Sequence, residues 1–230
     1  MEAKTEVHKR KIGSVIIFDL YGDLADGDID AIKDFIERNI QRGGFRNVIL
    51  NTQNVVHVDQ LALRKILIPL ERPHRKAIYC HSNNLMESFL NTYLPDKMTI
   101  CKNEQEVSNT FGLYLVERDK FIFKGERRKN KRIDVAVPVT INVPTSATEA
   151  TTVTALITNL SEGGFFAECL DLQSALSLRN LRDFRNLAAK ATFKPPLSSE
   201  SQNFESELLR MEVTSRQTGF ASKFMTPFEA

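Results

Sequence analysis

The hydrophobic pattern of this chain changes rhythm near its midpoint, and that change constrains the fold more than any other feature. In the first half, short apolar runs alternate with segments whose apolar residues recur at helical spacing. Strands that alternate with helices predict a sheet with a helical layer. In the second half, short β-rich runs are separated by polar turns, which predicts an antiparallel barrel or sandwich. A length of 230 residues is sufficient for two such domains.

Strands and helices are predicted in alternation along the first half. Each of the first two helices is preceded by an aspartate that can cap it by accepting a hydrogen bond from its first turn. The cap is Asp26 or Asp28 for the first helix and Asp59 for the second. Asn103 and Glu106 have the spacing of a capping box. The strands are expected at Val15–Leu20, Val48–Leu50, Ala77–Cys80 and Met98–Ile100, and the helices at Asp28–Arg42, Gln60–Glu71, Leu85–Tyr93 and Asn103–Tyr114.

The second half is predicted to begin with a basic connector, Lys120–Arg132, so we place the domains at residues 1–119 and 120–230. An amphipathic helix is expected at Leu176–Ala189. Lys194–Phe204 contains two prolines and several serines, which favours a mobile loop. The strands are expected at Val135–Val143, Thr151–Thr158, Phe165–Glu168, Leu208–Thr214 and Gly219–Phe224.

Composition excludes several classes of protein. No apolar run is long enough to span a bilayer, and the polar amino terminus lacks the apolar core of a signal peptide, so a cytoplasmic protein is expected. Cys80, Cys101 and Cys169 are far apart and lack metal-ligand spacing. We therefore expect reduced, mostly buried thiols and no metal site.

Two groups of residues in the second half suit a ligand that combines phosphates with guanine. Arg128 and Arg132 can place two guanidinium groups on one short segment, and a guanidinium binds phosphate oxygens in pairs, pairs with guanine or stacks on a base. Asn159, Ser161 and Gly164 follow a predicted strand. Asn159 offers a donor and an acceptor, and Ser161 offers a hydroxyl. Gly164 has a backbone that a base edge can approach closely.

Together, Arg128-x-x-x-Arg132 and Asn159-x-Ser161-x-x-Gly164 resemble the paired signature of PilZ domains, which bind the bacterial second messenger cyclic di-GMP. The resemblance covers about residues 120 to 228. It implies a ligand, cyclic di-GMP, and no other cofactor. Arg127 directly precedes the first motif arginine. In this respect the chain resembles PilZ members that take up a ligand dimer. The implied ligand-binding residues are Arg127, Arg128, Arg132, Asn159, Ser161, Gly163 and Gly164.

The first half resembles the STAS domain of anti-sigma factor antagonists over roughly residues 12 to 116. The resemblance rests on the Val15–Leu24 segment and on the order of the strands and helices that follow. Regulated members carry a phosphorylated serine at a helix amino terminus, but this chain has Gln60 after Asp59. Because Gln60 has no hydroxyl, we expect a fixed binding module that contacts a protein partner or a second copy of the chain.

No constellation typical of an enzyme is present, so catalysis is not expected. Cys80-His81 lacks an orienting partner, and Gly43-Gly44 and Gly163-Gly164 are too short for a phosphate-binding loop. The sequence predicts a two-domain cyclic di-GMP receptor with no nucleic-acid partner and no membrane insertion. A basic-strip nucleic-acid binder and a scaffold with a vestigial site remain the alternatives. The downstream output, the protein partner, the oligomeric state, the number of bound ligands and the role of residues 172 to 207 stay open.

Overall fold

The computed structural model describes residues 5–24, 28–116, 132–145, 149–171, 176, 178, 187–213 and 218–226. The chain divides into two compact units, residues 1–114 and residues 115–230. The boundary that the sequence predicts near residue 119 lies outside the described residues.

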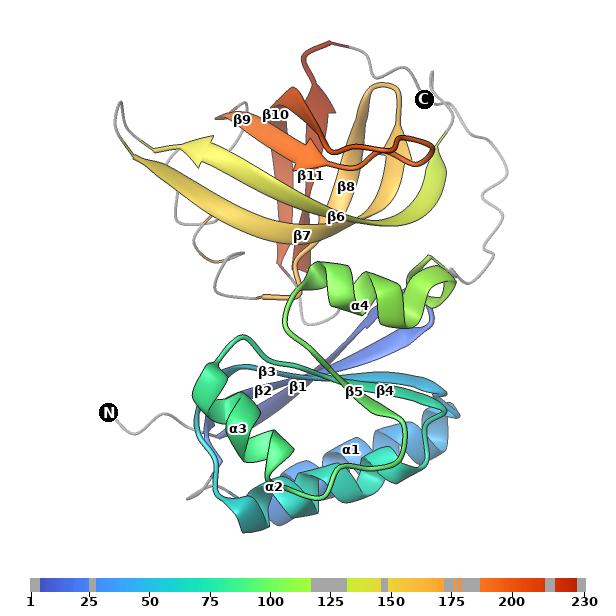
Figure 1. Cartoon of the computed structure of the whole chain (residues 1–230), viewed down its shortest axis with the longest axis vertical. Coiled ribbons are helices and arrows are strands. Elements are labelled where there is room, and N and C mark those ends of the chain that lie inside the picture. The colour runs from blue at the N-terminus through green and yellow to red at the C-terminus, as the bar shows by residue number, and fades with distance from the viewer. Residues whose placement is uncertain are drawn as a thin grey trace. The chain divides into compact units, whose positions relative to one another are not determined.

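The first unit is built on a five-stranded sheet in the order β1-β2-β3-β4-β5. The first pair is antiparallel and the others are parallel (Figure 1). The first strand was not predicted, because it carries five charged or histidine side chains and buries only Arg10 and Ile12. Its bounds and those of the other strands are Glu6–Ile12, Val15–Asp23, Asn47–His57, Arg75–Tyr79 and Met98–Cys101.

Helices lie on both faces of this sheet. The helices α1, α2 and α3 cover one face, and α4 lies on the other (Figure 1). The first face holds the main core, in which sheet residues such as Phe18 and Leu50 pack with Ile36 of α1 and Ile66 of α2. The helices span Ile29–Gly43 (α1), Gln60–Leu67 (α2), Asn83–Leu90 (α3) and Glu104–Phe111 (α4), with short 3-10 helices at Ile68–Glu71 (η1) and Gly112–Leu115 (η2).

The predicted caps of the first two helices are confirmed. Asp28 accepts a hydrogen bond from the backbone N–H of Ala31 at 3.0 Å, and Asp59 accepts one from Ala62 at 2.7 Å. Each bond satisfies one of the amide groups that have no partner in a first helical turn. The helix predicted at Gln60–Glu71 ends its α-helical part at Leu67, and Pro69 lies in the 3-10 helix that follows.

The capping box of α4 forms with one difference from its expected geometry. Asn103 accepts a hydrogen bond from the backbone N–H of Glu106 at 2.9 Å, as predicted. The Glu106 carboxylate accepts from the N–H of Lys102 at 2.7 Å. In a regular capping box that second bond comes from the cap residue itself. The helix start is therefore correct, while the reciprocal bond is made one residue earlier.

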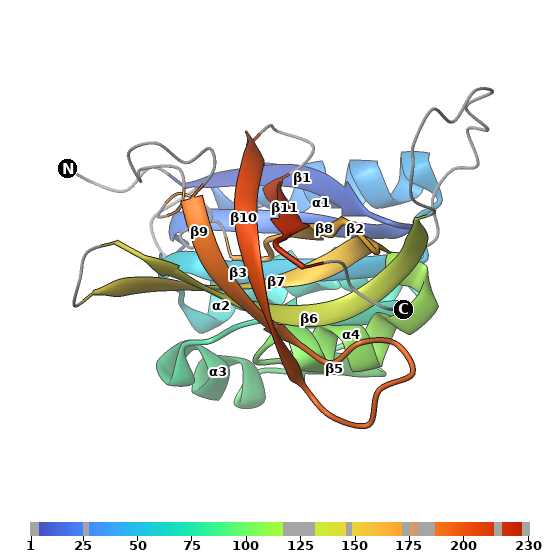
Figure 2. The same ribbon diagram turned by 90° about the horizontal axis from the view of Figure 1, so that it is seen from above.

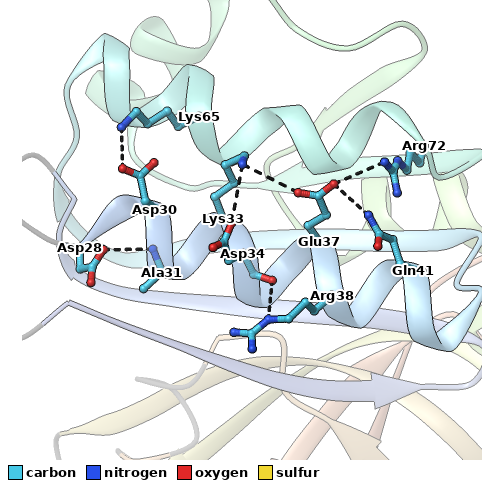
Figure 3. A network of polar contacts seen from close by, with 10 residues as sticks. All are labelled: Asp28, Asp30, Ala31, Lys33, Asp34, Glu37, Arg38, Gln41, Lys65 and Arg72. Carbon is cyan, nitrogen blue, oxygen red and sulfur yellow. Dashed lines mark hydrogen bonds and ion pairs between the residues drawn. The ribbon is translucent and has the colours of Figure 1, made fainter.

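A network of charged side chains joins α1 to α2 and to the end of η1 (Figure 3). Lys65 of α2 lies 2.9 Å from the carboxylate of Asp30, and Arg72 lies 3.4 Å from Glu37. Lys33 lies 3.8 Å from Glu37 on the same helix. These side chains range from 28% exposed at Lys33 and Glu37 to 69% at Asp30, and exposed ion pairs contribute about 0.2–1 kcal/mol each. The buried apolar face, not this network, holds the helices on the sheet.

The second unit is a closed antiparallel barrel in the order β10-β11-β8-β7-β6-β9, which can be followed in Figures 1 and 2. Closure decides between the two architectures that the sequence left open. In a closed sheet every strand has a neighbour on each side, and the inward side chains fill the interior. The strands span Ile133–Pro144 (β6), Ala150–Ser161 (β7), Gly164–Glu168 (β8), Leu187–Phe193 (β9), Gln202–Val213 (β10) and Thr218–Phe224 (β11).

Phenylalanine rings fill much of the barrel interior. Phe165 and Phe224 lie 5.5 Å apart between ring centroids, and the Phe193 and Phe204 rings stack at 4.6 Å. Phe220 is fully buried among them. Aromatic pairs at these separations add to the stabilisation that comes from burial alone. The predicted fold class, an α/β domain followed by a mainly β barrel, is confirmed.

Two predictions in the second half are wrong at their ends. The helix expected at Leu176–Ala189 is helical at residues 176 and 178, but its end overlaps β9, which begins at Leu187. Residues 177 and 179–186 lie outside the described residues. The loop expected at Lys194–Phe204 overlaps β10, which begins at Gln202. Alternate residues of β9 are buried, but several are alanines, whose short side chains give little apolar signal in the sequence. Pairing of β9 with both β6 and β10 makes it a strand.

Candidate functional site

A β-bulge in β7 turns Asn159 away from the barrel interior. In the pairing with β8, Ile157 lies opposite Ala167 and Asn159 opposite Phe166, so β7 contains one extra residue, Thr158. Ile157 and Leu160 both belong to the barrel core. With strict alternation Asn159 would share the inward face with Ile157, but the extra residue shifts the phase. Asn159 and Ser161 therefore lie together on the outward face of the strand.

Asn159 is held by the neighbouring strand β6. Its side chain is only 6% exposed, and Nδ2 donates a hydrogen bond to Oδ1 of Asp134 at 3.0 Å. The two residues lie opposite each other in the β6–β7 ladder. Beyond Asp134 the ladder shifts register before Val137, so the irregularities of both pairings lie between Ile157 and Asn159 of β7. Asp134 belongs to neither sequence motif, because its contact with Asn159 depends on the register of this pair.

Ser161 closes the hairpin between β7 and β8. Its Oγ donates to the carbonyl oxygen of Gly164 at 3.0 Å, and the two residues are paired across the two-residue turn Glu162–Gly163. The carbonyl of Gly163 accepts a hydrogen bond from the N–H of Phe224 at 3.1 Å. The turn is thus tied to its own strands and to β11, and a ligand would meet a preformed surface.

Gly164 has a structural reason to be glycine. A Cβ at this position would collide with the backbone carbonyl oxygen of Ser222 and lie 2.9 Å from Cα of Lys223, both on β11. The backbone of a paired strand cannot move aside at low cost. Glycine at this position therefore admits the close approach of β11.

Arg132 lies at the same end of the β6–β7 pair as the turn. It directly precedes Ile133, which is paired with Leu160, and its side chain is exposed. The predicted site residues Arg132, Asn159, Ser161, Gly163 and Gly164 thus meet at one end of the β6–β7–β8 sheet. Arg127 and Arg128 lie outside the described residues.

The sheet of the first unit contains a second polar cluster, which no sequence motif predicted. Arg10 donates two hydrogen bonds to Asp19, from Nε at 2.7 Å and from the terminal nitrogen NH2 at 3.0 Å. Asn51 on β3 donates to the same carboxylate at 2.7 Å. All three side chains are buried. Arg10 and Asp19 come from adjacent strands, and Asn51 lies opposite Asp19, so only the strand pairing assembles the cluster.

Gln60, which the sequence resemblance places at the serine position of regulated STAS proteins, is the first residue of α2. Asp59 caps that helix. Leu61 of α2 and Ile68 of η1 are exposed, and Tyr93 is exposed after α3. A shallow groove in this region is lined by Arg64, Leu67, Ile68, Glu71, Tyr93 and Pro95.

The three cysteines are buried and form no disulfide. Burial raises the pKa of the thiols of Cys80 and Cys101. A buried thiol with a raised pKa is a poor nucleophile. Among the residues that the structure describes, no group of histidine, cysteine and acidic side chains could hold a metal ion. No helix within the described ranges is long and apolar enough to cross a membrane.

No protein-family model matches the chain, and no curated protein does. Solved structures do match. The inhibitor of motility MotI/DgrA from Bacillus subtilis has 16% identity and a TM-score of 0.34, with 45% of this chain and 44% of that chain covered. The match therefore spans less than half of that protein.

Two further structures each correspond to one of the sequence resemblances. The unphosphorylated anti-sigma factor antagonist SpoIIAA has 16% identity and a TM-score of 0.35, with 46% of this chain and 94% of that chain covered. The PilZ domain of YcgR from Escherichia coli, solved with c-di-GMP, has 13% identity and a TM-score of 0.30, with 44% and 79% covered. The solved structures that match this chain include one from each family that its halves resemble, STAS and PilZ.

Proposed function

We propose that the chain is a receptor that binds cyclic di-GMP at the β7–β8 end of its barrel and transmits the binding event to protein interaction through the α/β unit. The observation that carries this proposal is the meeting of Arg132, Asn159 and Ser161 beside one tight turn. Bulges that re-aim side chains are frequent next to binding sites. Here a bulge directs a buried amide out of the core at that position.

The chemistry of the site matches a cyclic dinucleotide better than a plain polyanion. Arg127, Arg128 and Arg132 would bind phosphates in pairs and stack on guanine. Asn159 would offer hydrogen bonds to a guanine edge. A site that used phosphates alone would need no buried amide beside the arginines. The proposed function is therefore binding, without a catalytic step.

The route from the ligand to the α/β unit would be the connector Lys120–Arg132. It carries the motif arginines and joins the two domains in sequence. Binding would hold the connector against the barrel and change the surface that the α/β unit offers. Because Gln60 cannot be phosphorylated, the dinucleotide would be the switch. The exposed side chains Leu61, Ile68 and Tyr93 supply an apolar surface for a protein partner or a second copy.

Titration calorimetry with cyclic di-GMP tests the binding proposal. We expect heat from the wild type and at least tenfold weaker binding for Arg128→Ala and Arg132→Ala, because each loses a guanidinium that contacts the ligand. Lys129→Ala is the matched control in the same basic segment, and its affinity should stay within twofold of the wild type. No heat from the wild type, or equal affinity in all four proteins, would reject the proposal.

The same titration separates the remaining readings. A stoichiometry near two would support a ligand dimer at Arg127, and Arg127→Ala should reduce it to one. A nucleic-acid binder would bind through phosphates, with a steep dependence on salt and no dependence on Asn159. Retained binding of single-stranded DNA by Asn159→Ala, without cyclic di-GMP binding by the wild type, would favour that alternative.

Hydrogen exchange tests the coupling between the domains. Saturating cyclic di-GMP should change amide exchange in α2 and in the segment after α3, and Arg128→Ala should abolish the change. Sedimentation velocity on the same samples reports whether a second copy is the partner. Unchanged exchange in the α/β unit at full occupancy would reject the coupling and leave the binding proposal intact.

A further inference from the structure

We propose that Asp134 is a positioning residue for the dinucleotide site, which fixes the orientation of the Asn159 amide so that its oxygen accepts a hydrogen bond from guanine. The inference rests on the proposed cyclic di-GMP function. Neither sequence motif includes Asp134, which lies two residues after the second motif arginine.

The geometry of the pair makes Asp134 the holder of Asn159. The two residues are opposite partners in the antiparallel ladder, and the hydrogen bond from Nδ2 to Oδ1 measures 3.0 Å. Asn159 is 6% exposed, while Asp134 is exposed. Among the described residues, Asp134 is the only side chain with a hydrogen bond to the Asn159 amide. A buried amide with a single anchoring bond depends on that anchor for its orientation.

The chemistry of the two groups decides which end of the amide faces the ligand. A side-chain amide has a donating NH2 group and an accepting oxygen of similar size, so either can occupy a given place. An ionised carboxylate only accepts. Asp134 therefore holds the NH2 group of Asn159 toward β6 and directs the oxygen of Asn159 away from β6. Guanine carries an amino group at C2, which donates to such an oxygen.

An exchange of the two side chains tests this orientation directly. Asn159→Asp alone places two carboxylates opposite each other, and like charges at this separation repel. We expect its affinity for cyclic di-GMP to fall at least tenfold. Adding Asp134→Asn restores an amide–carboxylate pair with its direction reversed and still leaves an oxygen facing the ligand. The double variant should regain affinity to within about threefold of the wild type.

Asp134→Ala removes the carboxylate that accepts the hydrogen bond from Asn159, and Asn142→Ala is its matched control. Asn142 accepts a hydrogen bond from Thr152 at 2.7 Å, across the same two strands but farther along the ladder. We expect about tenfold weaker binding for Asp134→Ala and unchanged binding for Asn142→Ala, with both melting temperatures recorded. Thermal melting separates lost folding from lost orientation, because a purely structural role would lower stability and affinity together.

The outcomes distinguish this inference from the function on which it rests. If the wild type gives no heat with cyclic di-GMP, the proposed function is rejected, and the inference that rests on it is rejected as well. If the wild type binds and Asp134→Ala binds equally well, the inference alone is overturned. Failure of the double variant to regain affinity, at a melting temperature restored to that of the wild type, would also overturn it. Recovery of affinity in the double variant supports it.

Discussion

The two polar clusters of this molecule use their hydrogen bonds differently. In the α/β unit, the carboxylate of Asp19 accepts three hydrogen bonds, two from Arg10 and one from Asn51. In the barrel, the amide of Asn159 makes one side-chain hydrogen bond within the described residues, to Asp134. Both clusters lie between neighbouring strands, and both contain side chains that are more than nine-tenths buried.

This difference fits the proposal that the Asp19 cluster serves the fold and that Asn159 serves the ligand. A buried carboxylate with both oxygens paired has little left to offer, and its partners depend on it. A buried amide with one bond still has an acceptor and a second donor. Burial and charge alone would rank the Asp19 cluster as the more probable site. When the two clusters are compared by their unused hydrogen-bonding capacity, Asn159 ranks first as a candidate ligand site.

The largest expected effect on stability is at the Asp19 cluster of the α/β unit. Asp19→Ala should lower the free energy of unfolding by about 3–5 kcal/mol, because it leaves the buried Arg10 without its counter-charge. Urea denaturation measures the loss, and cyclic di-GMP affinity under conditions where the variant is folded should be unchanged. A loss below about 1 kcal/mol would break the contrast between a structural cluster and a binding one.

Gly164→Ala should have the next largest effect, a loss of about 1–3 kcal/mol, because the added methyl group overpacks the contact with β11. Gly44→Ala is the control from the other unit. Gly44 has φ of 58° but open space around it, so its cost is the left-handed backbone alone, about 1 kcal/mol. Equal losses at the two positions, by chemical denaturation, would show that crowding by β11 adds nothing.

Ser161→Ala should cost about 1 kcal/mol of stability through its lost hydrogen bond to Gly164. If Ser161 also contacts the ligand, the affinity for cyclic di-GMP falls in addition, and calorimetry at matched folded fraction measures that second loss. A stability loss with full affinity would assign Ser161 to the turn and leave Asn159 as the ligand contact in the hairpin.

Alkaline pH should weaken the α/β unit through its two shifted thiols. Burial raises the pKa of Cys80 and Cys101 above the ordinary value of 9.0, so above about pH 9 the unfolded chain releases protons that the folded chain retains. Stability is therefore unaffected by these groups below that pH and falls as pH rises. The lowered pKa of Lys76, caused first by burial, acts in the opposite direction. Cys80→Ala should flatten the decline in urea denaturation between pH 8 and pH 10; an unchanged slope would contradict the assignment.

The smallest effect is expected at the surface network of α1. Asp30→Ala should change the free energy of unfolding by no more than about 0.5 kcal/mol, because the Asp30–Lys65 pair is exposed and screened by salt. Denaturation at low and high salt measures it. A loss as large as that of Asp19→Ala would contradict the distinction between buried and exposed ion pairs on which the comparison depends.

Local features were the ones that could be read from the sequence. The caps Asp28, Asp59 and Asn103 act within their own first helical turns, so their spacing in the chain is enough to identify them. The alternation of strands and helices predicted the sheet in the same way. The first and ninth strands were missed, since charged residues in one and alanines in the other obscure the period of two.

The candidate site also has features that the sequence predicts and features that only the tertiary structure decides. Its residue types are evident in the motifs, because Arg132, Asn159 and Ser161 can be recognised by spacing alone. What each side chain contacts was decided by tertiary structure. The bulge at Thr158 sets which face Asn159 occupies, the β6–β7 register brings Asp134 to it, and β11 crowds Gly164. The sequence by itself determined the chemistry and the order of the elements, whereas strand register, which joins residues far apart in the chain, decided the contacts.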